Sequence, residues 1–208
     1  MSRGFIVTGT DTGIGKTVFA AGLTGALGAA YWKPVQSGLE DETDTEAIAR
    51  LNAGRDVAII REAYRLVTPC SPHEAARIDG VAIDLARLAL PKTERTLIVE
   101  GAGGALVPYT DDLLAADLFA KWGLPAIVVA RTALGTISHT LLTLEALRMR
   151  DIPIAGVAFV GEEEPVAQAA IAHFGQAPML GRLPLLDPLT VETLQTAFAA
   201  NIQLDLLA

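Results

Sequence analysis

Short, largely apolar runs alternate along this chain with longer amphipathic stretches. A run with few polar residues is typical of a strand that is buried on both faces of a parallel sheet. On this basis we expect strands over residues 5–7, 29–35, 96–99, 125–130, 154–160 and 179–181.

The segments between these runs place apolar residues three and four positions apart, as Phe19 and Leu23 do, which gives a helix one apolar face. We expect helices over residues 18–27, 45–51, 74–78, 83–90, 113–122, 137–149, 165–174 and 191–200. Strands alternating with helices predict an α/β fold with a doubly wound, mostly parallel sheet. Ligands bind such sheets at the carboxyl ends of the strands.

Length and composition fit one domain covering residues 1–208, because no linker, repeat or low-complexity segment interrupts the pattern. Hydrophobic residues make up 51% of the chain and charged residues 19%, as in globular proteins. The formal net charge is -8. An acidic chain without a basic stripe is a poor candidate for binding nucleic acid or an anionic membrane.

Cysteine content and hydropathy indicate where the protein works. Cys70 is the single cysteine, so neither a disulfide framework nor a cysteine-based zinc site is expected. We see no room for a signal peptide before the first strand, and no apolar run approaches the roughly 18 residues of a membrane span. We therefore expect a cytoplasmic protein that binds no membrane.

A glycine-punctuated turn ending in Gly15-Lys16-Thr17 joins the first strand to the first helix. This strand, loop and helix order is the context that a phosphate-binding loop requires, and it predicts a fold of the P-loop NTPase type. The first glycine is Gly9, one position earlier than in the commonest spelling, which would place it at residue 10. An ordinary strand-to-helix turn is the alternative.

In a phosphate-binding loop the lysine reaches the β- and γ-phosphates, and the hydroxyl after it lies on a magnesium ion. These roles fall here to Lys16 and Thr17. Backbone N–H groups and the helix dipole would bind the remaining phosphate oxygens. The predicted nucleotide-binding residues of the loop are Gly13, Ile14, Gly15, Lys16, Thr17 and Val18.

Polar residues from other segments follow predicted strands and should meet the loop at the same edge of the sheet. Mg²⁺ prefers oxygen ligands and takes one or two carboxylates besides phosphate, so Thr17, Asp44 and Glu100 are the candidate ligands. Glu100 could instead cap a neighbouring helix, and Asp44 could be the N-cap of the helix over 45–51. Lys33 follows a strand and is a second candidate for stabilising phosphoryl charge, unless it is a plain surface lysine.

Taken together, several segments carry a specific resemblance that runs in order through residues 4–186. They are Gly9-Thr10-Asp11-Thr12, Gly15-Lys16-Thr17, Lys33-Pro34-Val35, Ser37-Gly38, Ser71-Pro72-His73, Val99-Glu100-Gly101-Ala102-Gly103-Gly104 and Leu134-Gly135-Thr136-Ile137-Ser138-His139. The chain resembles the dethiobiotin synthetase family in these segments and in its length.

The resemblance implies ATP-dependent ring closure of 7,8-diaminononanoate with CO2 in biotin biosynthesis. One amine forms a carbamate, the carbamate takes the γ-phosphoryl group of ATP, and the second amine attacks the mixed anhydride. By this resemblance Lys16 and Lys33 are the catalytic residues, and Thr12, Lys33 and Ser37 contact the diamine or its carbamate. Thr17, Asp44 and Glu100 hold Mg²⁺, and Glu100, Gly101, Ala102 and Gly103 lie along the nucleotide.

The family is homodimeric, and the second subunit holds the substrate carboxylate. The matching residues here are Gly135, Thr136 and Ser138, at the start of the helix predicted over 137–149. A helix N-terminus suits a carboxylate, although Thr136 and Ser138 could simply cap that helix. We expect His139 to be a packing or interface residue and assign no chemical role to His73 or His173.

Base recognition is where the chain departs from its family. Many relatives end the strand over 154–160 with an asparagine that reads adenine, whereas this chain has Val160-Gly161. We expect Leu183, Pro184 and Leu185 to help enclose the base. Discrimination among ATP, GTP and CTP should therefore be weak.

Two other classes share this kind of loop. Carboxylate-amidating enzymes of corrin biosynthesis carry a glutaminase domain with a nucleophilic cysteine, for which this chain has no spare length. Partitioning or positioning ATPases are switched by nucleotide and bind partners, and they carry an extra loop lysine where this chain has Asp11. Both readings are weaker than the resemblance described above.

Overall fold

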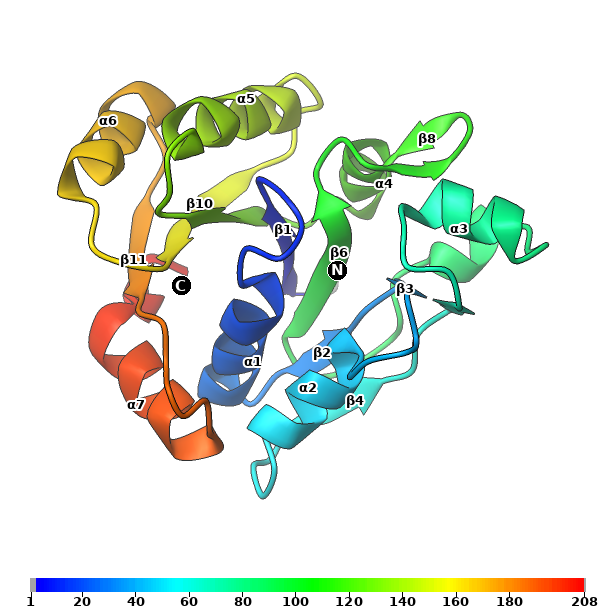
Figure 1. Cartoon of the computed structure of the whole chain (residues 1–208), viewed down its shortest axis with the longest axis horizontal. Helices are drawn as coiled ribbons and strands as arrows, with labels where there is room; N and C mark the ends of the chain where they lie inside the picture. Colours follow the sequence, from blue (N-terminus) through cyan, green and yellow to red (C-terminus); the bar gives the residue numbers. More distant parts are fainter. Residues whose placement is uncertain (1–2, 208) are drawn as a thin grey trace.

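The computed structural model describes residues 3–207, and its centre is a seven-stranded sheet in the order β11-β10-β9-β1-β6-β2-β4. All neighbouring pairs in this sheet are parallel, which confirms the predicted α/β class (Figure 1). Its strands are β1 (Gly4–Gly9), β2 (Ala30–Trp32), β4 (Ala58–Ile60), β6 (Leu97–Gly104), β9 (Ala126–Arg131), β10 (Ile154–Val160) and β11 (Met179–Leu183).

Helices cover both faces of the sheet, and each face has its own apolar cluster. One cluster packs beneath α1 (Lys16–Leu27), α2 (Asp44–Leu51) and α7 (Val191–Asn201). The other packs beneath α4 (Ala115–Trp122), α5 (Thr136–Arg148) and α6 (Pro165–Gly175). Within residues 3–207, none of these helices has the length and apolar character needed to cross a bilayer.

Smaller elements flank the carboxyl ends of β2 and β6 (Figure 1). Two of the strands pair in parallel beside the main sheet, and two others form an antiparallel hairpin. The elements are β3 (Val35–Ser37), β5 (Tyr64–Leu66), α3 (Pro72–Ile78), η1 (Leu85–Leu88), β7 (Pro108–Thr110) and β8 (Leu113–Leu114), with η2 (Leu204–Leu207) near the chain end.

Several predicted elements were wrong in extent; the strand expected over 96–99, for example, continues to Gly104 as β6. The strand expected over 29–35 is divided, because β2 ends at Trp32 and β3 begins only after Pro34, which has no N–H to donate. The helix expected over 83–90 is a 3₁₀ turn of 4 residues, η1. The helix expected over 113–122 begins at Ala115, because the two leucines before it pair with β7.

Strand order explains where a ligand can enter. The connection after β1 passes through α1 to β2, whereas the connection after β9 passes through α5 to β10 on the opposite side of β1, so the winding reverses between β1 and β9. Crevices at the carboxyl ends of strands, where the winding reverses, are the usual ligand sites of doubly wound sheets.

Candidate functional site

The loop of residues 10–15 leaves β1 at Gly9 and enters α1 at Lys16. Gly13 and Gly15 have φ angles of 69° and 95°, in the left-handed region that suits glycine. Gly15 is the N-cap of α1 and no side chain caps this helix, so its first N–H groups remain available to a ligand. Free N–H groups and the positive end of the helix dipole both favour an anion here.

Lys16 folds back over this loop, and its Nζ donates to the carbonyl of Asp11 at 2.6 Å. Its aliphatic stem passes Gly9, where an added Cβ would lie 2.9 Å from Lys16 Cδ. The glycine at position 9 therefore has a packing reason, which the unusual spelling of the loop did not reveal. Burial, helped by the nearby Lys33 ammonium, lowers the pKa of Lys16 to about 8.

Four side chains from α1, α2, β6 and the connection after β2 meet at the carboxyl ends of the strands, and we call them the strand-end cluster: Thr17, Lys33, Asp44 and Glu100. The Thr17 hydroxyl donates to Asp44 Oδ1 at 2.6 Å and lies 3.0 Å from Glu100 Oε1. Lys33 Nζ lies 2.5 Å from Asp44 Oδ2 and 3.1 Å from Glu100 Oε1. Lys33 is thus not a plain surface lysine, since only 4% of it is exposed.

Burial and mutual attraction set the charges of this cluster. Burial raises the pKa of Glu100, although the Lys33 ammonium opposes that shift. Burial alone would lower the pKa of Lys33, but Glu100 and Asp44 raise it above its ordinary value. Asp44 is also partly buried, yet Lys33 and the Thr17 hydroxyl hold the pKa of its carboxyl below the usual range. Lys33 and Asp44 are therefore an ionised pair at neutral pH.

The sequence left two roles open for Asp44, a magnesium ligand or the N-cap of the helix over 45–51. The N-cap role is wrong. Thr43 is the cap, because its hydroxyl accepts the N–H of Glu46 and the Glu46 carboxylate accepts the N–H of Thr43. Asp44 is the first helical residue, and its carboxylate points to Thr17 and Lys33 instead.

The oxygens of Thr17, Asp44 and Glu100 suit a magnesium ion. In an octahedron with bonds of about 2.1 Å, neighbouring ligand oxygens lie roughly 3 Å apart. The Thr17 hydroxyl is 2.6 Å and 3.0 Å from the two carboxylates, close to that spacing. Residues 3–207 contain no group of three or more His, Cys, Asp or Glu side chains placed for a metal, so phosphate oxygens and water would complete the shell.

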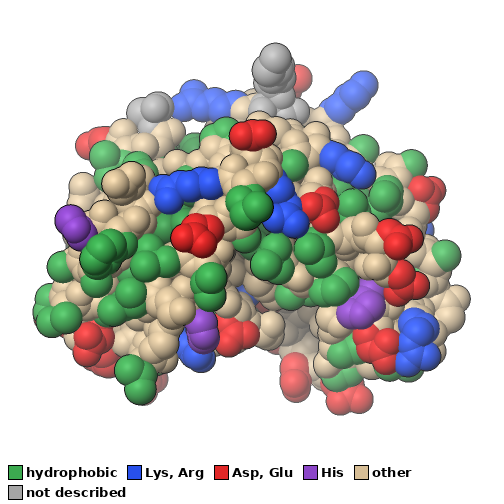
Figure 2. All heavy atoms as spheres, turned by 90° about the horizontal axis from the view of Figure 1, so that it is seen from above, with side chains coloured by type: hydrophobic (Ala, Val, Ile, Leu, Met, Phe, Trp, Pro, Cys, Tyr) green, Lys and Arg blue, Asp and Glu red, His purple; other side chains and the backbone are tan. Residues whose placement is uncertain are grey.

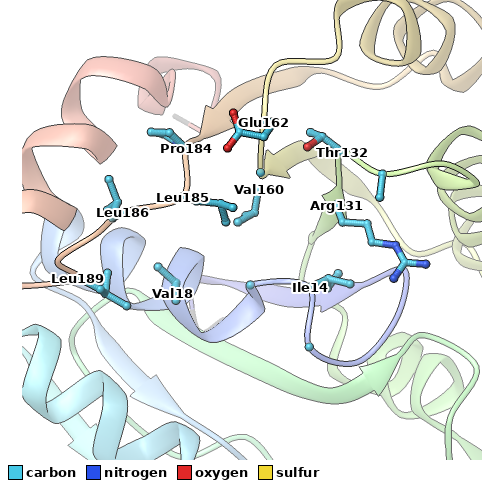
Figure 3. Close-up of a pocket in the computed structure, with 14 residues that line it drawn as sticks. Ile14, Val18, Arg131, Thr132, Val160, Glu162, Pro184, Leu185, Leu186 and Leu189 are labelled. Carbon is cyan, nitrogen blue, oxygen red and sulfur yellow. The ribbon is translucent and has the colours of Figure 1, made fainter.

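A cavity of about 520 Å³ lies beside the loop and α1 (Figure 3). Its walls are mainly apolar, and Val160 and Leu185 approach each other across it. The predicted base-enclosing residues Pro184 and Leu185 line the cavity, whereas Leu183 is fully buried in the sheet and does not. The lining residues are Gly13, Ile14, Gly15, Val18, Arg131, Thr132, Ala133, Val160, Gly161, Glu162, Pro184, Leu185, Leu186 and Leu189.

The asparagine was expected at Val160-Gly161, where β10 ends, and Val160 covers the loop. An added Cβ at Gly15 would lie 2.6 Å from Val160 Cγ1, so the valine packs directly on the loop backbone. The carbonyl of Gly161 accepts a hydrogen bond from Arg182 at 2.8 Å. The end of β10 thus offers an apolar side chain to the cavity, and Glu162 is exposed at its rim (Figure 3).

A second cavity, of about 410 Å³, lies on the other side of the strand-end cluster. It brings together Thr12, Lys33 and Ser37, the three residues predicted to contact the diamine. The Ser37 hydroxyl is buried without a hydrogen-bond partner among residues 3–207, so a ligand in this cavity could use it. The other lining residues are Val35, Gln36, Asp44, Pro69, Cys70, Ser71, Pro72, Ala102, Gly103 and Val107.

Sequence reasoning did not assign Pro69 or Val107 to this cavity. Val107 reaches it because Gly103, with a φ of 67°, turns the chain at the end of β6, and an added Cβ at Gly103 would meet Val107. Ser71 and Pro72 also line this cavity, and they belong to a segment on which the family resemblance rests. That segment was the sequence signal for this wall of the cavity.

Gly135, Thr136 and Ser138 do not line the cavity that holds Thr12, Lys33 and Ser37. Gly135 is the N-cap of α5, with a φ of 93° and no side-chain cap, so the capping alternative for Thr136 and Ser138 is wrong. Exposed apolar side chains flank this helix start, with Leu134 fully exposed and Leu142 60% exposed. Figure 2 shows exposed apolar side chains on both halves of the face seen from above, including the half formed by α5 and α6.

Comparison with known proteins gives matches over almost the whole chain. The family model described as AAA domain matches residues 3–193. A protein of Brucella ovis named ATP-dependent dethiobiotin synthetase BioD is 59% identical over 99% of this chain and 97% of its own length. A Brucella melitensis protein of the same name is 58% identical over the same shares.

Solved structures show how widely the fold is shared. A ParA family ATPase from Chlorobium tepidum superposes with a TM-score of 0.56 over 96% of this chain and 93% of its own, at 12% identity. The cell division ATPase MinD of Pyrococcus furiosus gives 0.55 over 93% and 89%, at 15% identity. Likeness at such identity establishes the fold, whereas full-length identity near 60% establishes the family. The chain belongs to the ATP-dependent dethiobiotin synthetase family.

Proposed function

We propose that this chain catalyses the ATP-dependent ring closure of 7,8-diaminononanoate with CO2 to dethiobiotin, a step of biotin biosynthesis. One observation supports the proposal above the others. Lys33 belongs both to the strand-end cluster beside the phosphate loop and to the wall of the cavity that holds Thr12 and Ser37. A single ammonium group can therefore contact a transferring phosphoryl group and the acceptor that receives it.

The reaction would proceed in three steps. One amine of the substrate attacks CO2 and loses a proton, which leaves a carbamate. A carbamate oxygen attacks the γ-phosphorus of ATP, and ADP leaves. The second amine attacks the carbonyl of the mixed anhydride, phosphate leaves with the bonding electrons, and loss of a proton completes the cyclic urea.

The chain would contribute position and charge to these steps rather than a covalent intermediate. Lys16 would contact the β- and γ-phosphates, and Lys33 would neutralise charge on the carbamate and the transferred group. Thr12 and Ser37 would donate hydrogen bonds to the carbamate or orient the free amine. Lys33 is held in place because it is buried and bonded to two carboxylates.

Thr17, Asp44 and Glu100 would hold the Mg²⁺ ion that accompanies ATP. When bound, the ion would offset the charge that develops during phosphoryl transfer. The remainder of the nucleotide would extend along Gly101, Ala102 and Gly103 at one end and into the 520 Å³ cavity at the other, where Pro184 and Leu185 cover the base.

We also propose that the working enzyme is a homodimer in the cytoplasm. The start of α5 has free N–H groups that suit a carboxylate, but Gly135, Thr136 and Ser138 lie outside the substrate cavity of their own chain. A second subunit could bring them to it, and the exposed Leu134 and Leu142 beside them would be covered by such an interface. Light scattering after gel filtration would give twice the chain mass of 21.8 kDa.

The function is tested by mixing the purified protein with MgATP, bicarbonate and 7,8-diaminononanoate. ADP release should depend on both the diamine and bicarbonate, and the product should have the mass of dethiobiotin. Turnover stimulated by DNA or by a protein surface, and indifferent to the diamine, would instead indicate a partitioning type of ATPase.

A further inference from the structure

Tyr31 lies beneath the strand-end cluster, in β2, and its hydroxyl donates to Glu100 Oε2 at 2.9 Å. The Tyr31 side chain is completely buried in the apolar cluster under α1, α2 and α7. Among residues 3–207, Glu100 is the hydrogen-bond partner found for this hydroxyl. A buried hydroxyl without a partner is costly, so the phenol and the carboxylate depend on each other.

The two oxygens of Glu100 have different tasks. Oε1 faces the Thr17 hydroxyl at 3.0 Å and Lys33 Nζ at 3.1 Å, on the side of the phosphate loop. Oε2 faces the opposite way and is held by Tyr31. The bond that carries a carboxylate rotates easily, because such torsions have broad and shallow minima. A hydrogen bond on one oxygen therefore decides where the other points.

The register of the sheet explains why a tyrosine at position 31 can reach this carboxylate. Tyr31 is opposite Ile98 in the parallel pairing of β2 with β6. Side chains two residues apart on a strand point to the same face, so Glu100 projects beside Tyr31 rather than to the far side of the sheet. The length of the phenol covers the two-residue offset along the strand.

We propose that Tyr31 is a positioning residue, which fixes the Glu100 carboxylate so that Oε1 is presented to the metal of the bound nucleotide. The inference rests on the proposed magnesium role of Glu100. Hydrogen bonds to ligating carboxylates typically change metal affinity or activity by 10- to 100-fold when they are removed. Tyr31 touches neither nucleotide nor diamine, and acts only through Glu100.

The test is the substitution Tyr31→Phe, which removes the hydroxyl and keeps the ring in the apolar cluster. Mn²⁺ affinity in the presence of ADP, measured by electron paramagnetic resonance, should fall by about 10-fold or more. ADP binding in EDTA, measured by calorimetry, should stay within about twofold, because the phosphate loop is unchanged. This division between metal-dependent and metal-free binding would not arise from a general loss of stability.

Tyr64→Phe is the matched control. Tyr64 is also a buried tyrosine, and its hydroxyl accepts the N–H of Asp84 at 2.7 Å, in β5 and away from Glu100. This variant should lose similar thermal stability and keep both binding constants. Equal loss of Mn²⁺ affinity in both variants, or unchanged Mn²⁺ affinity after Tyr31→Phe, would overturn the proposal.

A second measurement keeps the native hydroxyl in case Tyr31→Phe fails to fold. With 3-fluorotyrosine at position 31, the fluorine resonance should shift when Mg²⁺ is added to the ADP complex, because the metal withdraws charge from Glu100. An unshifted resonance would contradict the proposal. Neither measurement needs the diamine, so a failure of the proposed ring closure would be seen separately.

Discussion

The two ends of the proposed nucleotide site are built in opposite ways. At the phosphate end, Lys33 and Glu100 are almost fully buried, and each contacts several polar partners at 3.1 Å or less. At the base end, the cavity is mainly apolar, Leu185 is 68% exposed and Glu162 lies at the rim. Buried, fully partnered charges fix geometry, whereas an open apolar cavity favours any flat ring. Phosphoryl chemistry should thus be far less tolerant of change than base recognition.

The largest effect is expected from Lys33→Ala, which removes the charge shared by the strand-end cluster and the proposed substrate cavity, the one that holds Thr12 and Ser37. Loss of one preorganised charge-stabilising group costs about 10²- to 10³-fold in kcat, and Lys33 should lie at the upper end because it is buried. Steady-state ADP release with saturating diamine and bicarbonate measures this. His173→Ala, an exposed change in α6, is the control and should keep the native rate. Native turnover of the Lys33 variant would remove this lysine from the mechanism.

Base choice should be weak in the native protein. Because Val160 is where an adenine-reading amide was expected, kcat/KM for ATP, GTP and CTP should differ by less than about a hundredfold, which equals roughly 2.7 kcal/mol. Rates with each triphosphate at subsaturating concentration give the ratios. A larger preference for ATP would show that other groups at the rim, such as Glu162 or Thr132, read the base.

An amide introduced at position 160 should increase base selectivity and leave the phosphate end unchanged. Val160→Asn exchanges side chains of similar size at a position that is 8% exposed and beside the cavity. One amide pairing with adenine is worth about 1–3 kcal/mol, so the ATP-to-CTP ratio should rise about 10-fold. The rate with saturating ATP should stay near native. A fall in kcat for every triphosphate would mean that Val160 supports the loop through Gly15 more than it shapes the base site.

The smallest expected effect is the proton uptake that accompanies nucleotide binding. The pKa of Lys16 is about 8 without ligand, and the charges of a bound nucleotide must raise it. Lys16 should therefore take up about half a proton on binding at pH 8, where the phosphates of ADP are already ionised, and affinity should weaken as pH rises through 8. Calorimetry of ADP binding in two buffers of different ionisation enthalpy measures the uptake. Proton release at pH 8 would contradict the burial of Lys16.

Contiguous features were predictable from the sequence. The phosphate loop lies within one strand, turn and helix, and its residues carry their own signals of glycine and Gly-Lys-Thr spacing. The alternation of apolar strands with helices similarly predicted the parallel sheet, because strands covered on both faces leave a clear hydropathy pattern.

Features that depend on register or on competing caps were not predictable. Thr43 and Asp44 can both begin a helix, and only the reciprocal bonds with Glu46 decide for Thr43. Tyr31 reads as an ordinary buried strand residue, since its partner Glu100 is 69 positions away and meets it only through the pairing of β2 with β6. Val107 joins the cavity that holds Thr12 and Ser37 through the turn at Gly103, and a glycine in the sequence does not reveal in which direction the chain turns.

A crystal structure with MgADP tests the central claim most directly. The account predicts phosphates on the backbone of residues 13–17, the metal on Thr17 with Asp44 and Glu100 Oε1 in its shell, and the base between Val160 and Leu185. Phosphates bound elsewhere, or a Glu100 carboxylate facing away from the metal, would contradict it.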